Sequence, residues 1–153
     1  MRQAFRCARA NYAFTSTTHN LNLPGRIDLT LKIHELNHVA IHVHDLEASM
    51  HFYGEILELP LIPRPAFDFP GAWYALGSQE LHLVEDKSLQ PGERYHHHFA
   101  LLVTDTYAAR AELERRGVTS FISHGPRPDG PIQLFLTDPD GYRFELFSAV
   151  PSE

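Results

Sequence analysis

The stretch Leu36-Asn37-His38-Val39-Ala40-Ile41-His42-Val43-His44-Asp45 decides the fold. Apolar and polar residues alternate along it, which predicts a strand with one face on a core and one face exposed. A second stretch, His98-Phe99-Ala100-Leu101-Leu102-Val103-Thr104-Asp105, has the same pattern. Its histidine follows the first by 60 residues (98 − 38), and Ala40, Val43 and Asp45 recur at that offset. The chain is therefore predicted to contain two copies of one unit, each opening with a histidine-bearing strand.

Length and composition limit the class of protein. The chain has 153 residues, enough for one domain or two small fused halves, and 43% of them are hydrophobic, which is typical of a globular protein. A formal net charge of -6 argues against nucleic acid and against an anionic membrane as partners. No apolar run reaches the roughly 20 residues that span a bilayer. The single cysteine, Cys7, and the lack of a secretory apolar segment favour a cytoplasmic protein.

Residues 1–31 stand outside the repeat. They contain several arginines and no acid before Asp28, so import into an organelle remains an alternative to the cytoplasm. We expect them to form an N-terminal arm that packs on its own domain or on a partner protomer. The repeated domain is expected to cover 32–149.

The first unit continues with a helix and three strands. Asp45 is a suitable N-cap for a helix over 46–57, in which apolar residues recur at helical spacing. Strands are predicted at 61–62, 73–76 and 80–84, with a proline-rich loop after the first of them. The unit therefore has the order β-α-β-β-β and covers about 34–86.

The second unit repeats that order after a linker at 86–95. It has a predicted strand at 98–104, a helix at 106–116 that Gly117 ends, and strands at 118–122, 132–136 and 142–147. The predicted loop between the strands at 118–122 and 132–136 contains Gly125 and Pro126. Asp138-Pro139-Asp140-Gly141 marks a turn before the last strand. The predicted fold class is α+β, with two repeated βαβββ modules, the second at about 96–149.

Four residues that commonly bind metals fall at equivalent places in the two units. By strand alternation each lies on the face opposite its apolar neighbours, which are expected to face the helices. Two such sheets closing on each other would bring the four side chains together. Three imidazoles and one carboxylate suit Fe(II), Ni(II), Co(II), Zn(II) or Mn(II). The alternative is that these are ordinary half-exposed strand residues. They are His38, His82, His98 and Glu145.

The sequence resembles the vicinal oxygen chelate superfamily, which includes glyoxalase I, methylmalonyl-CoA epimerase, extradiol dioxygenases, fosfomycin-resistance enzymes and bleomycin-binding proteins. The resemblance covers about 32–148 and lies in the residues around His38, those around His98, and Asp138-Pro139-Asp140-Gly141-Tyr142-Arg143-Phe144-Glu145-Leu146. It implies two βαβββ modules that form a cupped, barrel-like mixed sheet with helices outside. It also implies metal ligands on the first and fourth strands of each module, at His38, His82, His98 and Glu145, and a homodimer.

The chain departs from the individual families. Glyoxalase I usually has a carboxylate, and the epimerase a glutamine, where this chain has His82. A fosfomycin-resistance enzyme would be expected to have threonine at Ala40. Metal-free bleomycin-binding proteins lack these metal ligands. The presence of all four in this chain therefore argues against a protein that only sequesters a compound.

Further residues are candidates for binding substrate or for an alternative ligand. The aromatic residues could line an apolar pocket, and the arginines could hold a carboxylate, although each could equally be an ordinary surface residue. His96 shares the strand face of His98 and is a rival ligand. The candidate substrate contacts are Phe67, Trp73, Tyr74, His42 and Arg143, followed by Phe69, Tyr95, His44, Arg64 and Arg127.

The function expected from these residues is that of a metal-dependent, glyoxalase-like lyase or isomerase. It would bind a small substrate through two adjacent oxygens and stabilise an enediolate, with Glu145 as base and Glu80 as fallback. We expect one divalent metal ion per site and no organic cofactor, with glutathione as a candidate co-substrate. One alternative is an extradiol Fe(II) dioxygenase that uses His38, His98 and Glu145. The other is a non-catalytic protein of the bleomycin-resistance type that captures an aromatic compound.

Overall fold

The computed structural model describes residues 33–90, 92 and 97–149. Contacts between Cα atoms divide the chain into two units, Met1–His34 and Glu35–Glu153, and the second unit is described below. The predicted arm at 1–31, the rival ligand His96 and the candidate Tyr95 lie outside the described residues. No helix within the described ranges is both long and apolar enough to cross a membrane.

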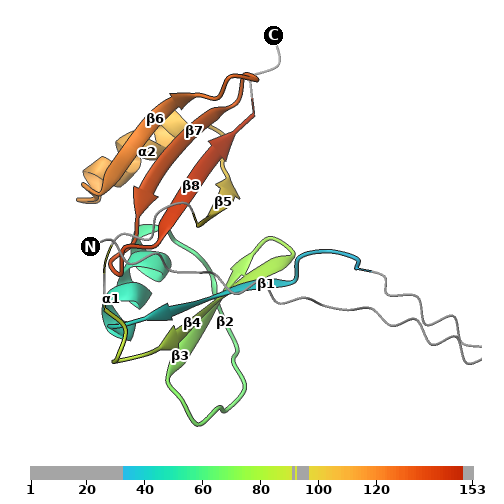
Figure 1. Ribbon diagram of the computed structural model, residues 1–153, viewed down its shortest axis with the longest axis vertical. Coiled ribbons are helices and arrows are strands. Elements are labelled where there is room, and N and C mark those ends of the chain that lie inside the picture. Colours follow the sequence, from blue (N-terminus) through green and yellow to red (C-terminus); the bar gives the residue numbers. More distant parts are fainter. Residues whose placement is uncertain (1–32, 91, 93–96, 150–153) are drawn as a thin grey trace, which may run out of the picture. The chain divides into compact units, whose positions relative to one another are not determined.

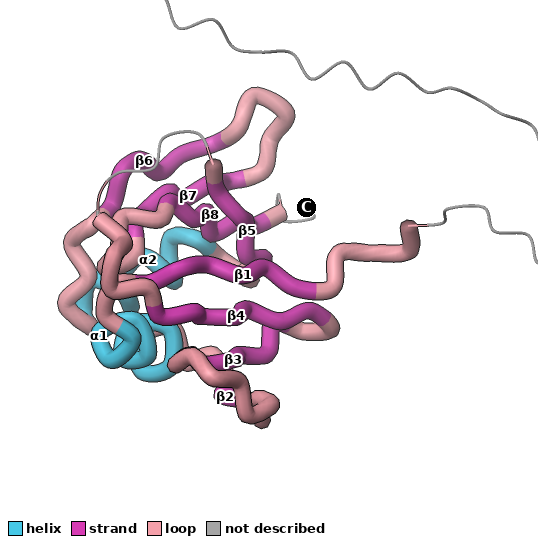
Figure 2. Tube along the Cα trace, turned by 60° about the horizontal axis from the view of Figure 1, so that its bottom comes forward, coloured by secondary structure: helices cyan, strands magenta, loops and turns pink. Residues whose placement is uncertain are grey.

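Module 1 consists of one strand, one helical segment and three more strands. Strand β1 is followed by α1, the π-helix η1, and β2, β3 and β4. The four strands form one mixed sheet in the order β1-β4-β3-β2, in which β1 runs parallel to β4 (Figure 2). The bounds are β1 His38–Val43, α1 Leu46–Met50, η1 His51–Ile56, β2 Leu61–Ile62, β3 Gly71–Leu76 and β4 Gln79–Glu85.

Module 2 repeats the topology of module 1. Its sheet has the order β5-β8-β7-β6, with β5 parallel to β8, and α2 follows β5 as α1 follows β1 (Figure 1). The predicted α+β class and the two βαβββ modules are therefore confirmed. The bounds are β5 His98–Leu102, α2 Thr106–Arg115, β6 Phe121–Pro126, β7 Ile132–Thr137 and β8 Arg143–Ser148.

The helical segment predicted at 46–57 begins as expected but changes its period. Asp45 caps it, accepting a hydrogen bond from the backbone N–H of Ala48 at 3.1 Å. From His51 onward the turns widen into a π-helix, in which the N–H of Leu57 donates to the carbonyl of Phe52. The wider turns contain Tyr53, which is fully buried and bonded to module 2. Spacing of apolar residues alone does not report such tertiary contacts.

The strand predicted at 118–122 was misplaced, because β6 covers Phe121–Pro126. Val118 is 7% exposed, and its N–H bonds to Leu113, so it closes the end of α2 and packs in the core instead of entering the sheet. Gly117 has a φ of 88°, as expected for the residue that ends a helix. Pro126 fits in a strand because β6 is an edge strand, where a missing N–H costs little.

The Asp138–Gly141 turn joins the two modules within one chain. The hydroxyl of Tyr53 donates to Asp138 at 2.7 Å, and the N–H of His44 donates to Asp140 at 3.0 Å. Burial raises the pKa of Asp138 to about 6, although hydrogen bonds from Tyr53 and from the N–H of Tyr142 act against this. Burial likewise raises the pKa of Tyr53. The turn that leads into β8 is therefore held against β1 and the helical segment of module 1.

Candidate functional site

Ring side chains of three adjacent strands stack on one face of the module 1 sheet. His82 of β4 lies between Trp73 of β3, with ring centroids 3.9 Å apart, and His38 of β1, with centroids 4.4 Å apart. Both pairs are nearly parallel, at 5° and 13°. The sheet explains this order, since Trp73 pairs directly with His82 while Leu81 and Leu83 are buried on the opposite face. The structure thus brings together His38 and His82, two of the four predicted ligands.

Glu80 belongs to the same group. Its Oε2 lies 2.7 Å from Nε2 of His82, and it pairs with His38 in the register of β1 and β4. The side chain of His82 is 11% exposed and that of Glu80 is 36% exposed, so the imidazole is covered while the carboxylate reaches solvent. A carboxylate beside an imidazole can share or hold a proton, which is the chemistry that the sequence assigned to Glu80.

The other two predicted ligands, His98 and Glu145, lie together in module 2. Nε2 of His98 is 3.3 Å from Oε2 of Glu145, and Glu145 is only 4% exposed. Gln133 of β7 donates to Oε1 of Glu145 at 2.8 Å, and Phe135 packs edge-on against His98 with centroids 5.2 Å apart. Gln133 was not predicted as a site residue. It shares the strand face of Glu145, so the alternation argument applied to β7 could have found it.

The four predicted ligands are thus brought together in two pairs. Among the described residues, no group of three or more His, Cys, Asp and Glu side chains could hold a metal ion. The donors of each pair are nevertheless of the types that divalent transition metals prefer. Each module therefore offers two donors, and a complete set of four requires the two pairs to meet.

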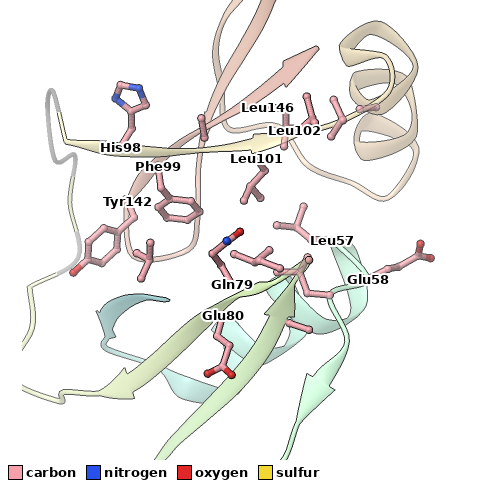
Figure 3. A pocket seen from close by; sticks show the side chains of 18 of the residues that line it. Leu57, Glu58, Gln79, Glu80, His98, Phe99, Leu101, Leu102, Tyr142 and Leu146 are labelled. Atoms are coloured by element: carbon pink, nitrogen blue, oxygen red, sulfur yellow. The ribbon is translucent and has the colours of Figure 1, made fainter. Parts of the chain in front are cut away.

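A cavity of about 1280 Å³ is lined by residues of both modules, mainly from the apolar side of the strands. Figure 3 shows Phe99 and Leu101 pointing into it from β5, while His98 points the opposite way; Glu80 likewise points away from the side to which Gln79 points. The walls are mainly apolar and include Val39 of β1. Its lining comes mainly from the apolar faces of the modules but also includes Glu80 and His98, so the cavity adjoins both groups of candidate site residues.

An aromatic loop follows β2 and approaches the stacked rings. Its Phe67 ring lies 5.1 Å from Phe69 and 6.0 Å from Trp73, measured between centroids. Arg64 lies over both phenylalanine rings, and its Nη2 donates to the carbonyl of Phe69 at 2.7 Å. The predicted substrate contacts Phe67 and Trp73 are therefore neighbours of the imidazole pair.

The other candidate substrate contacts are scattered. Tyr74 lies on the helix side, 1% exposed, with its hydroxyl 3.4 Å from the carbonyl of Met50, so we leave it out of the proposed site. His42 is on the face of His38 and lies 3.5 Å from Asp86. Arg143 lies over the ring of Phe135, beside the module 2 pair. Arg127 pairs with Asp129, and His44 lies at the junction with Asp140.

Replacing Gly71 by alanine should destabilise this part of module 1 strongly. A Cβ at Gly71 would lie 2.3 Å from the carbonyl oxygen of Leu83 and 3.3 Å from Nε of Arg64, so β3 and the loop would have to shift. We expect the free energy of unfolding in urea to fall by about 2 kcal/mol or more. Gly125→Ala is the matched control, because its Cβ would meet open space. Equal losses in the two variants would contradict this account.

Comparisons with known proteins agree with the topology. Residues 35–146 match the Glyoxalase/Bleomycin resistance protein/Dioxygenase superfamily. A lactoylglutathione lyase of Neisseria meningitidis is 31% identical over 121 residues, which cover 72% of this chain and 88% of that protein. A lactoylglutathione lyase of Arabidopsis thaliana is 26% identical, and the chain spans 44% of its length.

A solved structure supports the same relationship. A glyoxalase family protein of Bacillus anthracis superposes with a TM-score of 0.68 at 29% sequence identity, covering 77% of this chain and 97% of that one. The match between sequence, topology and structure extends over both modules. The chain belongs to the Glyoxalase/Bleomycin resistance protein/Dioxygenase superfamily.

Proposed function

We propose that this protein is a metal-dependent lyase or isomerase of the glyoxalase type, acting on a small substrate with two adjacent oxygens. One observation carries the proposal: His38 with His82, and His98 with Glu145, occupy equivalent positions of the two modules on the faces opposite the buried apolar residues. The lactoylglutathione lyases among the relatives support the reaction class. A divalent metal ion bound there would act as a Lewis acid towards substrate oxygens.

The donor set favours one divalent ion per site, with Ni, Co, Zn, Mn and Fe(II) as candidates. A histidine that binds a metal through one ring nitrogen commonly donates from the other to a carboxylate. The contact between His82 and Glu80 supplies such a carboxylate. His82 would then act as the ligand, and Glu80 would fix its orientation.

We infer that the site is completed in a homodimer, by module 1 of one protomer and module 2 of its partner. The strands that carry His38 and His98, β1 and β5, are edge strands of their sheets. Exposed edges are favourable places for pairing with another strand. On the face of His98, Leu102 is 77% exposed, which is unfavourable for a large apolar side chain unless another surface covers it. Two protomers related by a two-fold axis would form two sites.

Proton transfer is assigned to the chain's own carboxylates. Glu145 is held through Oε1 by Gln133, while its Oε2 faces His98. Glu80, on the other module, reaches solvent beside His82. Either could take a proton from the carbon next to a substrate carbonyl, with Glu145 as the first candidate. Glutathione is a candidate co-substrate because the lactoylglutathione lyases are relatives.

The exposed rings of Phe67 and Phe69 favour an aromatic substrate, and this observation supports a second candidate function. An extradiol dioxygenase would use His38, His98 and Glu145 to hold Fe(II). It would consume oxygen, whereas the lyase or isomerase would exchange a carbon-bound proton with solvent.

The test combines metal content with hydrogen exchange. Untagged protein purified without chelator is expected to contain about one divalent ion per chain, and His98→Ala and Glu145→Ala should each lose it. His51→Ala is the control, since His51 lies on η1 and pairs with Glu55. When the metal-loaded protein is incubated in D₂O with a hemithioacetal or a small 2-oxo compound, that substrate should gain deuterium at the carbon next to its carbonyl. Full metal content in both ligand variants would refute the site, and oxygen uptake only with Fe(II) would favour the dioxygenase.

A further inference from the structure

We propose that Arg64, Phe67 and Trp73 form a subsite for an aromatic carboxylate group of the substrate, beside the imidazole pair of module 1. This subsite deepens the proposed function and rests on it for its role in turnover. It predicts that the substrate carries an aromatic ring and a carboxylate in addition to the two oxygens offered to the metal.

The guanidinium of Arg64 places a positive charge beside the aromatic loop. Four other arginines form ion pairs with carboxylates, whereas Arg64 forms none among the described residues; the four are Arg110, Arg115, Arg116 and Arg127. Nε of Arg64 is buried and has no hydrogen-bond partner in the described part of the chain. Its Nη2 donates to the carbonyl of Phe69. A guanidinium prefers a carboxylate, to which it can donate two parallel hydrogen bonds.

The position of Arg64 is fixed by its neighbours. Its Cζ lies 4.8 Å from the ring centroid of Phe67 and 4.9 Å from that of Phe69. The guanidinium also lies against Gly71, where a Cβ would be 3.3 Å from Nε. Contacts with two rings and one backbone segment hold the cation in place before any ligand arrives, which lowers the entropy cost of binding.

The aromatic rings connect this cation to the ligand pair. Phe67 and Phe69 are 45% and 38% exposed, while the Trp73 ring is stacked on His82 and tilted by 48° against Phe67. A substrate ring resting on Phe67 would therefore join a row of rings that continues through Trp73 to His82. Exposed rings beside a cation that has no ion-pair partner in the described part of the chain are complementary to an aromatic acid, whose ring stacks and whose carboxylate pairs with arginine.

A purely structural role for Arg64 would be to close the loop through its bond to Phe69. That role explains the hydrogen bond from Nη2 to Phe69. It requires neither a positive charge nor a buried Nε that has no partner among the described residues. The two roles differ in one property that can be measured. A structural arginine would not make the protein distinguish a charged ligand from a neutral one of the same shape.

Trp73 makes the measurement direct, because it is the only tryptophan of the chain. Its fluorescence is followed while the full-length protein is titrated with 3-phenylpropanoate and, separately, with the matching primary amide. We expect the carboxylate to bind about tenfold more tightly than the amide. Arg64→Gln should abolish that preference and Arg64→Lys should retain part of it. Arg110→Gln, which removes an arginine of α2, is the matched control and should leave the preference unchanged.

A second variant keeps the test informative if Arg64→Gln fails to fold. Phe67→Ala should weaken the carboxylate and the amide equally, because it removes the stacking surface and leaves the cation. Equal binding of the two ligands by the wild type, or an undiminished preference in folded Arg64→Gln, would overturn the subsite. Titrations are run as purified and after chelator treatment. The preference for carboxylate then tests the subsite, whereas metal content and hydrogen exchange test the proposed function.

Discussion

Co-expression of His38→Ala and Glu145→Gln, two variants that are each expected to lack metal, should restore about a quarter of the wild-type metal content. The first variant damages module 1 and the second damages module 2. If each site combines module 1 of one protomer with module 2 of its partner, a mixed dimer has one site with both defects and one intact site. About half of randomly formed dimers are mixed, so about one site in four is intact.

Metal content is the readout because it does not depend on knowing the substrate. The two variants carry different affinity tags that are removed after sequential purification, so that mixed dimers can also be analysed alone, where about half of the sites should be filled. The control is the double variant His38→Ala/Glu145→Gln co-expressed with itself, which should stay empty. Empty mixed dimers would place the whole site within one chain. A monomeric mass in light scattering at micromolar concentration would exclude the shared site altogether.

The features that the sequence predicted well depend on local periodicity. A strand of alternating residues has only two faces, so the alternation around His38 and His98 assigned each side chain to a face without knowledge of the fold. The same alternation, applied to the last strand of each unit, placed His82 and Glu145 at equivalent positions. This is why the two βαβββ modules, and the strand face on which each of the four candidate ligands lies, could be predicted before the structure was known.

The features that the sequence did not predict depend on contacts between distant segments. The π-helix contains Tyr53, whose hydroxyl bonds to Asp138, 85 residues later in the chain. The start of β6 was misplaced because Val118 packs in the core, although its β-branched side chain also suits a strand. The grouping of the ligands as two separate pairs depends on how the modules pack, which alternation within a strand cannot report.

Replacing Asp138 by alanine should lower the free energy of unfolding by about 3 kcal/mol. Asp138 is 5% exposed and accepts hydrogen bonds from the Tyr53 hydroxyl and from the N–H groups of Asp140 and Tyr142. Alanine would leave all three donors without this partner in a buried place. Asp138→Asn should cost much less, because its carbonyl oxygen can still accept from the two N–H groups, while the Tyr53 hydroxyl can turn to accept from the amide.

The same residue should make stability depend on pH. Burial raises the pKa of Asp138 to about 6 from its ordinary value of 3.8, so the folded protein binds the proton more tightly than the unfolded chain does. The stabilisation by the protonated form is therefore complete below about pH 4 and is lost as the pH rises through about 6, a change of roughly 3 kcal/mol. Asp138→Asn has no proton to lose, so its free energy of unfolding should lack this decline.

Urea unfolding of both proteins from pH 4 to pH 8 measures the difference. Histidines and other acids also titrate in this range, but they are common to both proteins and cancel when the two curves are subtracted. Asp129→Asn is the control: Asp129 is exposed, and its pairing with Arg127 holds its pKa below the ordinary value, so this variant should retain the wild-type decline. Parallel curves for the wild type and Asp138→Asn would show that Asp138 stays ionised in the folded protein. In that case the hydrogen bonds from Tyr53 and from the two N–H groups would outweigh burial.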